Sequence, residues 1–368
     1  MSDPRIEKLA QVLTNYSIQV QPGQQIAIRG HWVARPLIIA TYRQVLRAGG
    51  HPFVYWNNSD LDEILLKEGS DEQLAHMPGP DKAIVETYDA TISILGTDNT
   101  RSLSGVDPAR QQLASRARRE LNQTLISREA AGEWTFVVTM FPTLAYAQEA
   151  DMSLSDYEDF VYGACLLDQP DPAAAWRDIS RRQQRLVDWL VGKQQVKITG
   201  PNVDMTLSIA GRGFINSAGR KNMPCGEIFT SPVENSAEGW IRFSYPAIAG
   251  GREVEGIELR FEKGRVVEAR AAKNEAFLRS MLDTDEGARY LGEFAIGTNK
   301  GIQQFTKSIL FDEKIGGTIH LALGRGFPKV GGENESVIHW DMISDMRAGG
   351  KIWVDGELFY DSGEFVVT

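Results

Sequence analysis

The chain has 368 residues, 42% of them hydrophobic and 24% charged, which is the composition of a globular protein long enough for two domains. Its 39 lysines and arginines and 49 aspartates and glutamates give a formal net charge of −10, which argues against a nucleic acid or an anionic membrane as the main partner. Because there are only two cysteines and the N-terminal residues MSDPRIEKLAQVL have no signal-peptide core, we expect a cytoplasmic protein without a disulfide framework or a membrane segment.

The first half of the chain alternates helical and strand patterns. Asp-Pro pairs at 3–4, 107–108 and 171–172 have the sequence of a helix start, with a capping carboxylate before a proline at the first helical position. Helices that alternate with short apolar strands are typical of a mostly parallel sheet covered on both faces. The expected strands cover residues 25–30, 52–56, 90–96 and 134–141, and the expected helices cover residues 36–48, 108–131 and a long stretch that ends near 192.

After about residue 195 the pattern changes to short strands separated by turn residues. Lys263-Gly264 and Asp355-Gly356 have the sequence of hairpin turns, and one helix over residues 274–291 interrupts the strands. We therefore predict an α/β N-terminal domain with a mostly parallel sheet at residues 1–195, and a β-rich α+β domain that carries the active site at residues 196–368. The strands expected in this half cover residues 196–199, 205–209, 240–245, 255–261, 265–269, 318–323 and 337–343.

Two of the five histidines, His320 and His339, lie on predicted strands of the second half. Side chains at positions i and i+2 of a strand point to the same face, so His339 and Asp341 project together and Trp340 packs on the other side. Two imidazoles and a carboxylate on neighbouring strands predict a site for a divalent metal ion. The other three histidines have no partner at ligand spacing and are interpreted as structural or exposed: His31, His51 and His76.

Two glutamates have unusual neighbours. Glu227 stands between turn residues and an apolar pair, and Glu293 stands among glycines and apolar residues. A charged group in an apolar context costs free energy unless it is paired or bound to a metal ion. From the spacing alone, an ion pair or solvation explains each glutamate better than a ligand role.

Four segments in the same order, GEIFTSPVENSAEG, LGEFAIGTN, DEKIGGTIHLALG and IHWDMI, resemble those of the thermophilic metallo-aminopeptidases, the group of aminopeptidases T and S and PepS. The resemblance covers essentially the whole chain. It implies a homodimeric aminopeptidase that releases N-terminal residues from short peptides with two divalent metal ions, which are zinc, cobalt or manganese. The resemblance also implies the metal ligands, which are Glu227, Glu293, His320, His339 and Asp341, with Glu313 as a further ligand or as the partner of a ligand.

In such a site a water molecule between the two metal ions attacks the peptide carbonyl. A carboxylate suits the bridging position, so we expect Glu293 or Asp341 to bridge, and Glu313 or Glu234 to carry a proton to the leaving amine. One position departs from the family, because Phe327 stands where the family usually has a tyrosine thought to take part in catalysis. Loss of one oxyanion donor typically costs about 10²–10³ in turnover. Either another donor serves, or the enzyme is slower, or the tyrosine is less essential.

Two other classes of protein stay open. His320, His339 and Asp341 alone satisfy the two-histidine, one-carboxylate site of iron(II) oxygenases, and a ring-cleaving hydroxypyridine dioxygenase family is similar in overall pattern. Glu227 and Glu293 favour the peptidase, since a second metal needs them and a one-iron site does not. A metal-binding homologue with little turnover, weakened by Phe327, is the third class.

Overall fold

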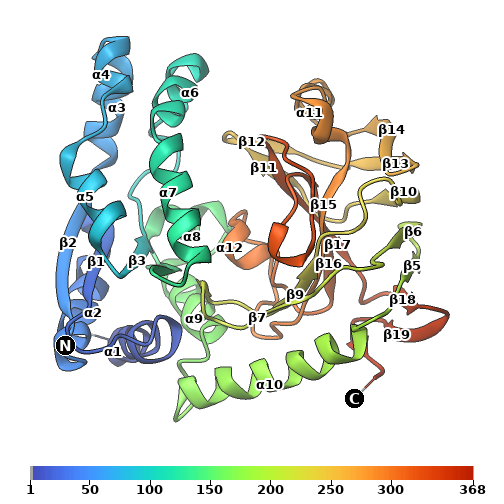
Figure 1. Ribbon diagram of the computed structural model, residues 1–368, viewed down its shortest axis with the longest axis horizontal. Coiled ribbons are helices and arrows are strands. Elements are labelled where there is room, and N and C mark those ends of the chain that lie inside the picture. Colours follow the sequence, from blue (N-terminus) through green and yellow to red (C-terminus); the bar gives the residue numbers. More distant parts are fainter. Residues whose placement is uncertain (1–2, 368) are drawn as a thin grey trace. The chain divides into compact units, whose positions relative to one another are not determined.

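The computed structural model describes residues 3–367. The chain divides into two compact units, one of residues 1–175 with 219–224 and the other of residues 176–218 with 225–368. The first unit holds a parallel sheet with helices, and the second is rich in antiparallel strands (Figure 1). The predicted fold class is therefore confirmed, while the domain boundary near residue 195 stays a prediction.

The parallel sheet of the first unit has the strand order β2-β1-β3-β4-β8. Its inner strands are nearly continuous apolar runs, as in Ile26, Ala27 and Ile28, which are fully buried. Such runs are expected where helices cover both faces of a sheet. The strands are β1 (Gln25–His31), β2 (His51–Asn57), β3 (Ala90–Leu95), β4 (Thr135–Met140) and β8 (Asn222–Met223).

The three predicted Asp-Pro helix starts are confirmed. The carboxylate of Asp3 accepts a hydrogen bond from the backbone N–H of Arg5, that of Asp107 from Ala109, and that of Asp171 from Ala174. The helices are α1 (Pro4–Gln11), α2 (Arg35–Arg47), α3 (Ser59–Glu68), α4 (Asp71–Ala75), α5 (Gly79–Thr87), α6 (Pro108–Ala117), α7 (Arg119–Ala130), α8 (Leu144–Glu149), α9 (Leu154–Ala164) and α10 (Pro172–Leu190). None of the helices within residues 3–367 is both long and apolar enough to cross a membrane.

Two large antiparallel sheets and a two-stranded one build the second unit. The larger has the order β14-β13-β10-β6-β5-β18-β19-β20, and the smaller has the order β17-β16-β15-β9-β7. The larger sheet consists of β5 (Gln195–Gly200), β6 (Val203–Ser208), β10 (Glu238–Arg242), β13 (Glu258–Glu262), β14 (Arg265–Arg270), β18 (Lys351–Val354), β19 (Glu357–Asp361) and β20 (Glu364–Phe365). The smaller consists of β7 (Ile215–Ser217), β9 (Glu227–Thr230), β15 (Leu291–Gly297), β16 (Thr318–Gly324) and β17 (His339–Asp345).

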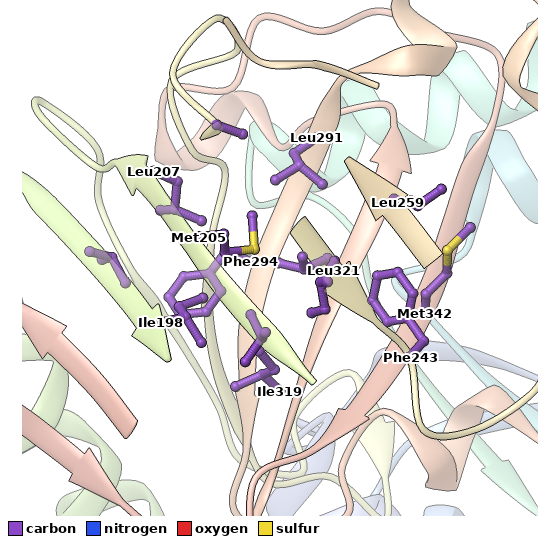
Figure 2. Close-up of a cluster of buried hydrophobic side chains, with 14 of the residues drawn as sticks. Ile198, Met205, Leu207, Phe243, Leu259, Leu291, Phe294, Ile319, Leu321 and Met342 are labelled. Carbon is purple, nitrogen blue, oxygen red and sulfur yellow. The ribbon is translucent and has the colours of Figure 1, made fainter. Parts of the chain in front are cut away.

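The main core of the second unit combines apolar side chains of both sheets (Figure 2). Ile198 and Met205 come from the larger sheet, and Phe294, Leu321 and Met342 come from the smaller one. Their burial removes apolar surface from water, which is the main stabilising term in folding. One face of the smaller sheet is thereby committed to packing, and its other face remains available for polar side chains.

The predicted helix over residues 274–291 is wrong in its second half. The helix α11 (Glu275–Leu282) ends at Asp283, a short 3₁₀ turn follows at Glu286–Arg289, and β15 begins at Leu291. The Asp285 carboxylate accepts hydrogen bonds from the hydroxyl of Ser336 and the backbone N–H of Val337. These contacts to a distant segment compete with the helix, as aspartate side chains often do.

Two further predictions concern turns and helix length. Both predicted hairpin turns are confirmed, since Lys263-Gly264 joins β13 to β14 and Asp355-Gly356 joins β18 to β19. All four of these residues have positive φ, as a two-residue hairpin turn of this kind requires. The single helix predicted over residues 108–131 is wrong, because the helix breaks at Arg118 into α6 and α7. The remaining short elements of the second unit are β11 (Ala247–Ala249), β12 (Arg252–Val254) and α12 (Ile309–Asp312).

Candidate metal centre

The smaller sheet of the second unit carries its functional side chains on the face opposite the core. In β15, Phe294 turns into the core and Glu293 turns away from it, because successive side chains of a strand alternate. Glu293 lies opposite Ala322 of β16, and Ala322 lies opposite Asp341 of β17. Trp340 is buried in the core, as its alternation with His339 and Asp341 predicts.

A small residue stands beside each functional side chain on a neighbouring strand. The register places Glu227 opposite Gly297, Glu293 and Asp341 opposite Ala322, His320 opposite Ala295, and His339 opposite Gly324. Directly opposite residues on one face of a sheet are the closest side-chain neighbours. Glycine and alanine at these positions therefore leave the space above the sheet to the carboxylates and imidazoles. The carboxylates and imidazoles on this side of the sheet, Glu227, Glu293, His320, His339 and Asp341, are together called the polar face below.

The five predicted ligands converge on this polar face. Glu293 contacts both histidines, with its Oε1 3.6 Å from Nε2 of His320 and its Oε2 3.1 Å from Nε2 of His339. Nε2 of His339 is 3.4 Å from Oδ1 of Asp341. Oε2 of Glu227 is 3.6 Å from Nε2 of His320. Side chains from four strands thus form one connected cluster.

The donor atoms of this cluster fit divalent cations. Potential ligand atoms lie within 4.8 Å of one another in two triads, one of Glu293, His339 and Asp341 and the other of Glu313, His320 and Asp341. Oε2 of Glu227, both ring nitrogens of His320 and Oδ1 of Asp341 are buried and have no hydrogen-bond partner among the described residues. An unsatisfied buried polar group costs about 1–3 kcal/mol. A cation satisfies the lone pairs of the carboxylates and of one imidazole nitrogen together, and mixed carboxylate and imidazole donors suit zinc, cobalt or manganese.

One hydrogen bond fixes the orientation of His339. Its Nδ1 lies 2.8 Å from the carbonyl oxygen of Arg325. Because a carbonyl only accepts, Nδ1 carries the proton and donates it, which leaves Nε2 facing Glu293 and Asp341. A metal-binding imidazole is commonly held by such a bond from its second nitrogen.

The charges of the cluster shift the pKa values of its members. Burial raises the pKa of Glu293, but the neighbouring imidazoles of His320 and His339 outweigh it and lower the pKa to about 2. Burial lowers the pKa of His339, but the carboxylates of Asp341 and Glu293 outweigh it and raise the pKa to about 11. Burial raises the pKa of Glu227 more than Lys314 and His320 lower it.

The family model of the thermophilic metalloproteases (M29) matches residues 2–365. The chain belongs to this family. Aminopeptidase T of Thermus thermophilus is 29% identical to it over 402 residues, which cover 97% of this chain and 95% of the relative. Aminopeptidase 2 of Geobacillus stearothermophilus is 28% identical over 351 residues, which cover 89% of this chain and 84% of the relative.

Solved structures agree with this assignment. The chain matches wild-type AmpT from Thermus thermophilus with a TM-score of 0.85 and 26% identity, over 99% of both chains. It also matches 2,5-dihydroxypyridine dioxygenase from Pseudomonas putida with a TM-score of 0.62 and 13% identity, over 100% of this chain and 99% of the other. The second likeness shows a shared fold. The predicted family is confirmed, and with it the enzyme class, a metal-dependent peptidase and therefore a hydrolase.

In this metalloprotease, Phe327 lies beside the polar face. Its ring centre is 5.3 Å from that of His339, in an edge-on arrangement, and 4.9 Å from that of Phe229. Its backbone N–H donates to the hydroxyl of Ser231, which itself donates to the carbonyl of Gly292 beside Glu293. The position is therefore tied to the metal centre, and it presents an apolar ring there without a hydroxyl.

The two candidate proton carriers have different surroundings. Glu234 forms an ion pair with Arg212 at 2.6 Å and accepts a hydrogen bond from the backbone N–H of Glu333. Glu313 has an oxygen in the triad with His320 and Asp341. Glu313 is therefore part of a candidate metal-binding triad, whereas Glu234 forms a salt bridge with Arg212.

Lys314 also belongs to the site, although the sequence did not predict it, and its side chain has no exposed surface. Its Nζ lies 3.2 Å from Oε1 of Glu227 and forms an ion pair with Oε1 of Glu313. A lysine is almost never fully buried unless it is paired. Its position next to Glu313 in the segment DEKIGG was the only signal in the sequence.

Proposed function

We propose that this metalloprotease is an aminopeptidase that removes the N-terminal residue of short peptides with the help of two divalent cations. The observation that carries the proposal is the pair of overlapping triads that share Asp341. Relatives that match nearly the whole chain are named aminopeptidases, which supports the choice of substrate. A cytoplasmic location and a homodimer stay predictions.

The ligands divide between two positions. If bound, one cation would be held by Glu293 and His339 and the other by Glu227 and His320, and Asp341 could serve both positions because it belongs to both triads. When bound, the two cations supply an ionised water near neutral pH, polarise the scissile carbonyl and bind the free amine of the substrate.

Protein groups orient the ligands and move the proton. His339 is aimed by the carbonyl of Arg325, and Glu293 remains ionised at neutral pH because the two imidazoles lower its pKa. Glu313 is the most exposed carboxylate of the cluster, with 17% of its side chain accessible against 6% for Glu293. We assign to Glu313 the transfer of a proton to the leaving amine, since a general acid must reach both the reacting centre and solvent.

The iron(II) dioxygenase alternative leaves part of the polar face unexplained. A one-iron site needs His320, His339 and Asp341 only. Glu227 and Glu293 would then be two further buried carboxylates within 3.6 Å of His320. Lys314 pairs with Oε1 of Glu227, but Oε2 is buried without a hydrogen-bond partner among the described residues, so the full donor set favours a pair of metal ions.

Metal analysis combined with an activity assay tests the proposal. The protein is treated with a chelator, reloaded with zinc, cobalt or manganese, and assayed with leucine p-nitroanilide. We expect binding of about two cations per chain and recovery of cleavage in proportion to loading. N-acetylated leucine p-nitroanilide serves as the control and should not be cleaved, because it lacks the free amine. One bound iron with oxygen uptake on a hydroxypyridine would overturn the proposal.

A further inference from the structure

We propose that Lys314 is a positioning residue that acts as a fixed internal cation, binding one oxygen of Glu227 and one of Glu313 so that only their other oxygens serve the metal centre. The inference rests on the proposed two-cation site and adds a residue to it. No role in the ligand set was expected for a lysine, since its ammonium group carries no lone pair.

The two oxygens of Glu227 have different partners. Oε1 is 3.2 Å from Nζ of Lys314, whereas Oε2 is 3.6 Å from Nε2 of His320. Oε2 is buried and has no hydrogen-bond partner among the described residues. The contact with Lys314 therefore fixes the rotation of the carboxylate and aims Oε2 at the cluster.

Glu313 likewise contacts both Lys314 and the candidate metal-binding residues. Its Oε1 forms an ion pair with Lys314, and the side chain also offers a ligand atom to the triad with His320 and Asp341. Lys314 thus stands between two carboxylates that flank the same imidazole. An ammonium group in this place repels a divalent cation, so the metal ions are confined to the side of His320 and Asp341.

The backbone holds Lys314 and Glu227 at a fixed separation. The side chain of Asn299, which is 3% exposed, donates to the carbonyl of Cys225, and the backbone N–H of Asn299 donates to the carbonyl of Lys314. Gly226 passes so close to Asn299 that an added Cβ would lie 2.9 Å from its Cβ. Asn299 therefore ties together the segments that precede Glu227 and contain Lys314, which is the kind of support that a preorganised site needs.

The arrangement predicts that Lys314→Met weakens cation binding at one of the two positions and not at the other. The substitution keeps the length of the side chain and removes its charge. Loss of an outer contact that orients a metal ligand typically costs about 10- to 100-fold in affinity. We expect the cation at Glu227 and His320 to bind about 10- to 100-fold more weakly. The cation at Glu293 and His339 should bind as in the unchanged protein, because Lys314 does not contact either residue.

Calorimetric titration of chelator-treated protein with Co²⁺, together with the visible spectrum of bound Co²⁺, measures both sites without an activity assay. Lys300→Met is the matched control, because Lys300 is exposed and its side chain pairs with Glu364. Equal weakening of both sites, or no weakening of either, would overturn the role of Lys314. Binding of fewer than two cations by the unchanged protein would instead contradict the proposed function.

A double variant covers the case in which Lys314→Met fails to fold. Lys314→Met combined with Glu227→Gln removes one positive and one negative charge, so the net charge of the cluster is unchanged and only the partly exposed Glu313 loses its ion-pair partner. If Lys314 acts by aiming Glu227, the double variant should bind Co²⁺ no more weakly than Glu227→Gln alone. A double variant that binds Co²⁺ more weakly than Glu227→Gln alone would show that Lys314 does not act through Glu227.

Discussion

Glu293 is the residue through which the two halves of the polar face are connected, since it contacts both histidines. Replacing it with alanine removes a proposed ligand and leaves the imidazoles without their shared partner. We predict that Glu293→Ala abolishes peptide cleavage and cation binding at the site formed with His339, while the circular dichroism spectrum stays that of the unchanged protein. Undiminished cleavage would count against the assignment of Glu293 as a ligand.

The raised pKa of His339 predicts how cation binding depends on pH. Without a bound cation, its imidazole keeps its second proton up to about pH 11 rather than the ordinary 6.5. The cation needs the lone pair of Nε2, so it competes with this proton, and metal affinity should rise with pH over this window. Calorimetry in buffers of different ionisation enthalpy should show protons released on binding. An affinity that falls as the pH rises from 6.5 would contradict the prediction.

The ion pair of His339 also affects folding of the cation-free protein. A histidine whose pKa is raised in the folded state stabilises that state fully below its unfolded pKa, and this contribution is lost as the pH rises through the folded value. For His339 the window lies between 6.5 and about 11. Chelator-treated protein should therefore lose stability toward the alkaline end of this window.

Phe327 offers a gain-of-function prediction. Its ring already lies against His339, so Phe327→Tyr adds a hydroxyl beside the metal centre with little repacking. We predict that turnover rises by up to about 10²-fold, the effect of one well-placed oxyanion donor, with unchanged cation content. Steady-state kinetics on leucine p-nitroanilide and metal analysis of the same samples test this. Unchanged turnover would show that another donor already serves.

Along the strand β15, side chains that pack in the core alternate with side chains that face the candidate metal centre. Phe294 packs in the core next to Glu293, which faces the metal centre. Large-to-small changes of a buried phenylalanine cost about 3–5 kcal/mol. We predict that Phe294→Ala lowers the free energy of unfolding by about this amount while the folded fraction still binds cations. Glu293→Ala is the matched comparison, because it should abolish cation binding at the site formed with His339 while the chain still folds.

The alternation of side chains along a strand allows only part of the site to be predicted from the sequence. The spacing of His339 and Asp341 predicts a shared face, and the motifs of a known family predict Glu227 and Glu293. The pairing of β15 with β16 and β9 joins residues far apart in the chain, and no local pattern specifies that register. The role of Lys314 could not be predicted for the same reason, since its partner Glu227 lies far away in the sequence.

Errors in the predicted elements also come from distant contacts. The helix expected over residues 274–291 ends early because Asp285 bonds to Ser336 and Val337. The helices α3, α4 and α5 were not predicted, because they are short and few of their residues are apolar and buried. Leu66 is the buried residue of α3, and Leu74 is that of α4. Strands were found more reliably where apolar residues run continuously, as in β1 and β3.

For the whole molecule, all the proposed ligands belong to the second of the two compact units. A cation that binds only the folded state stabilises it by mass action, by about 2.7 kcal/mol at 100 times the dissociation constant. The stabilisation should therefore be larger for the second unit than for the first. The two cysteines report on this, since Cys165 lies in the first unit, Cys225 lies in the second, and both are buried.

We predict that cations slow the labelling of Cys225 by a thiol reagent in mild urea more than that of Cys165, as measured by peptide mass spectrometry. Burial already raises the pKa of the Cys165 thiol, which keeps it unreactive in the folded protein. Glu293→Ala protein is the control, because it lacks a ligand and should show less protection. Equal protection of both cysteines would mean that the two units unfold together.

The position of β17 has a consequence for how the enzyme is made. His339 and Asp341 lie on this edge strand of the smaller sheet, later in the chain than every other proposed ligand. A ribosome releases Glu227, Glu293 and His320 into the cell before the strand that completes the centre has emerged. We therefore expect a growing chain to gain peptidase activity only after its final segment pairs with β16, and fragments that end before β17 to be inactive.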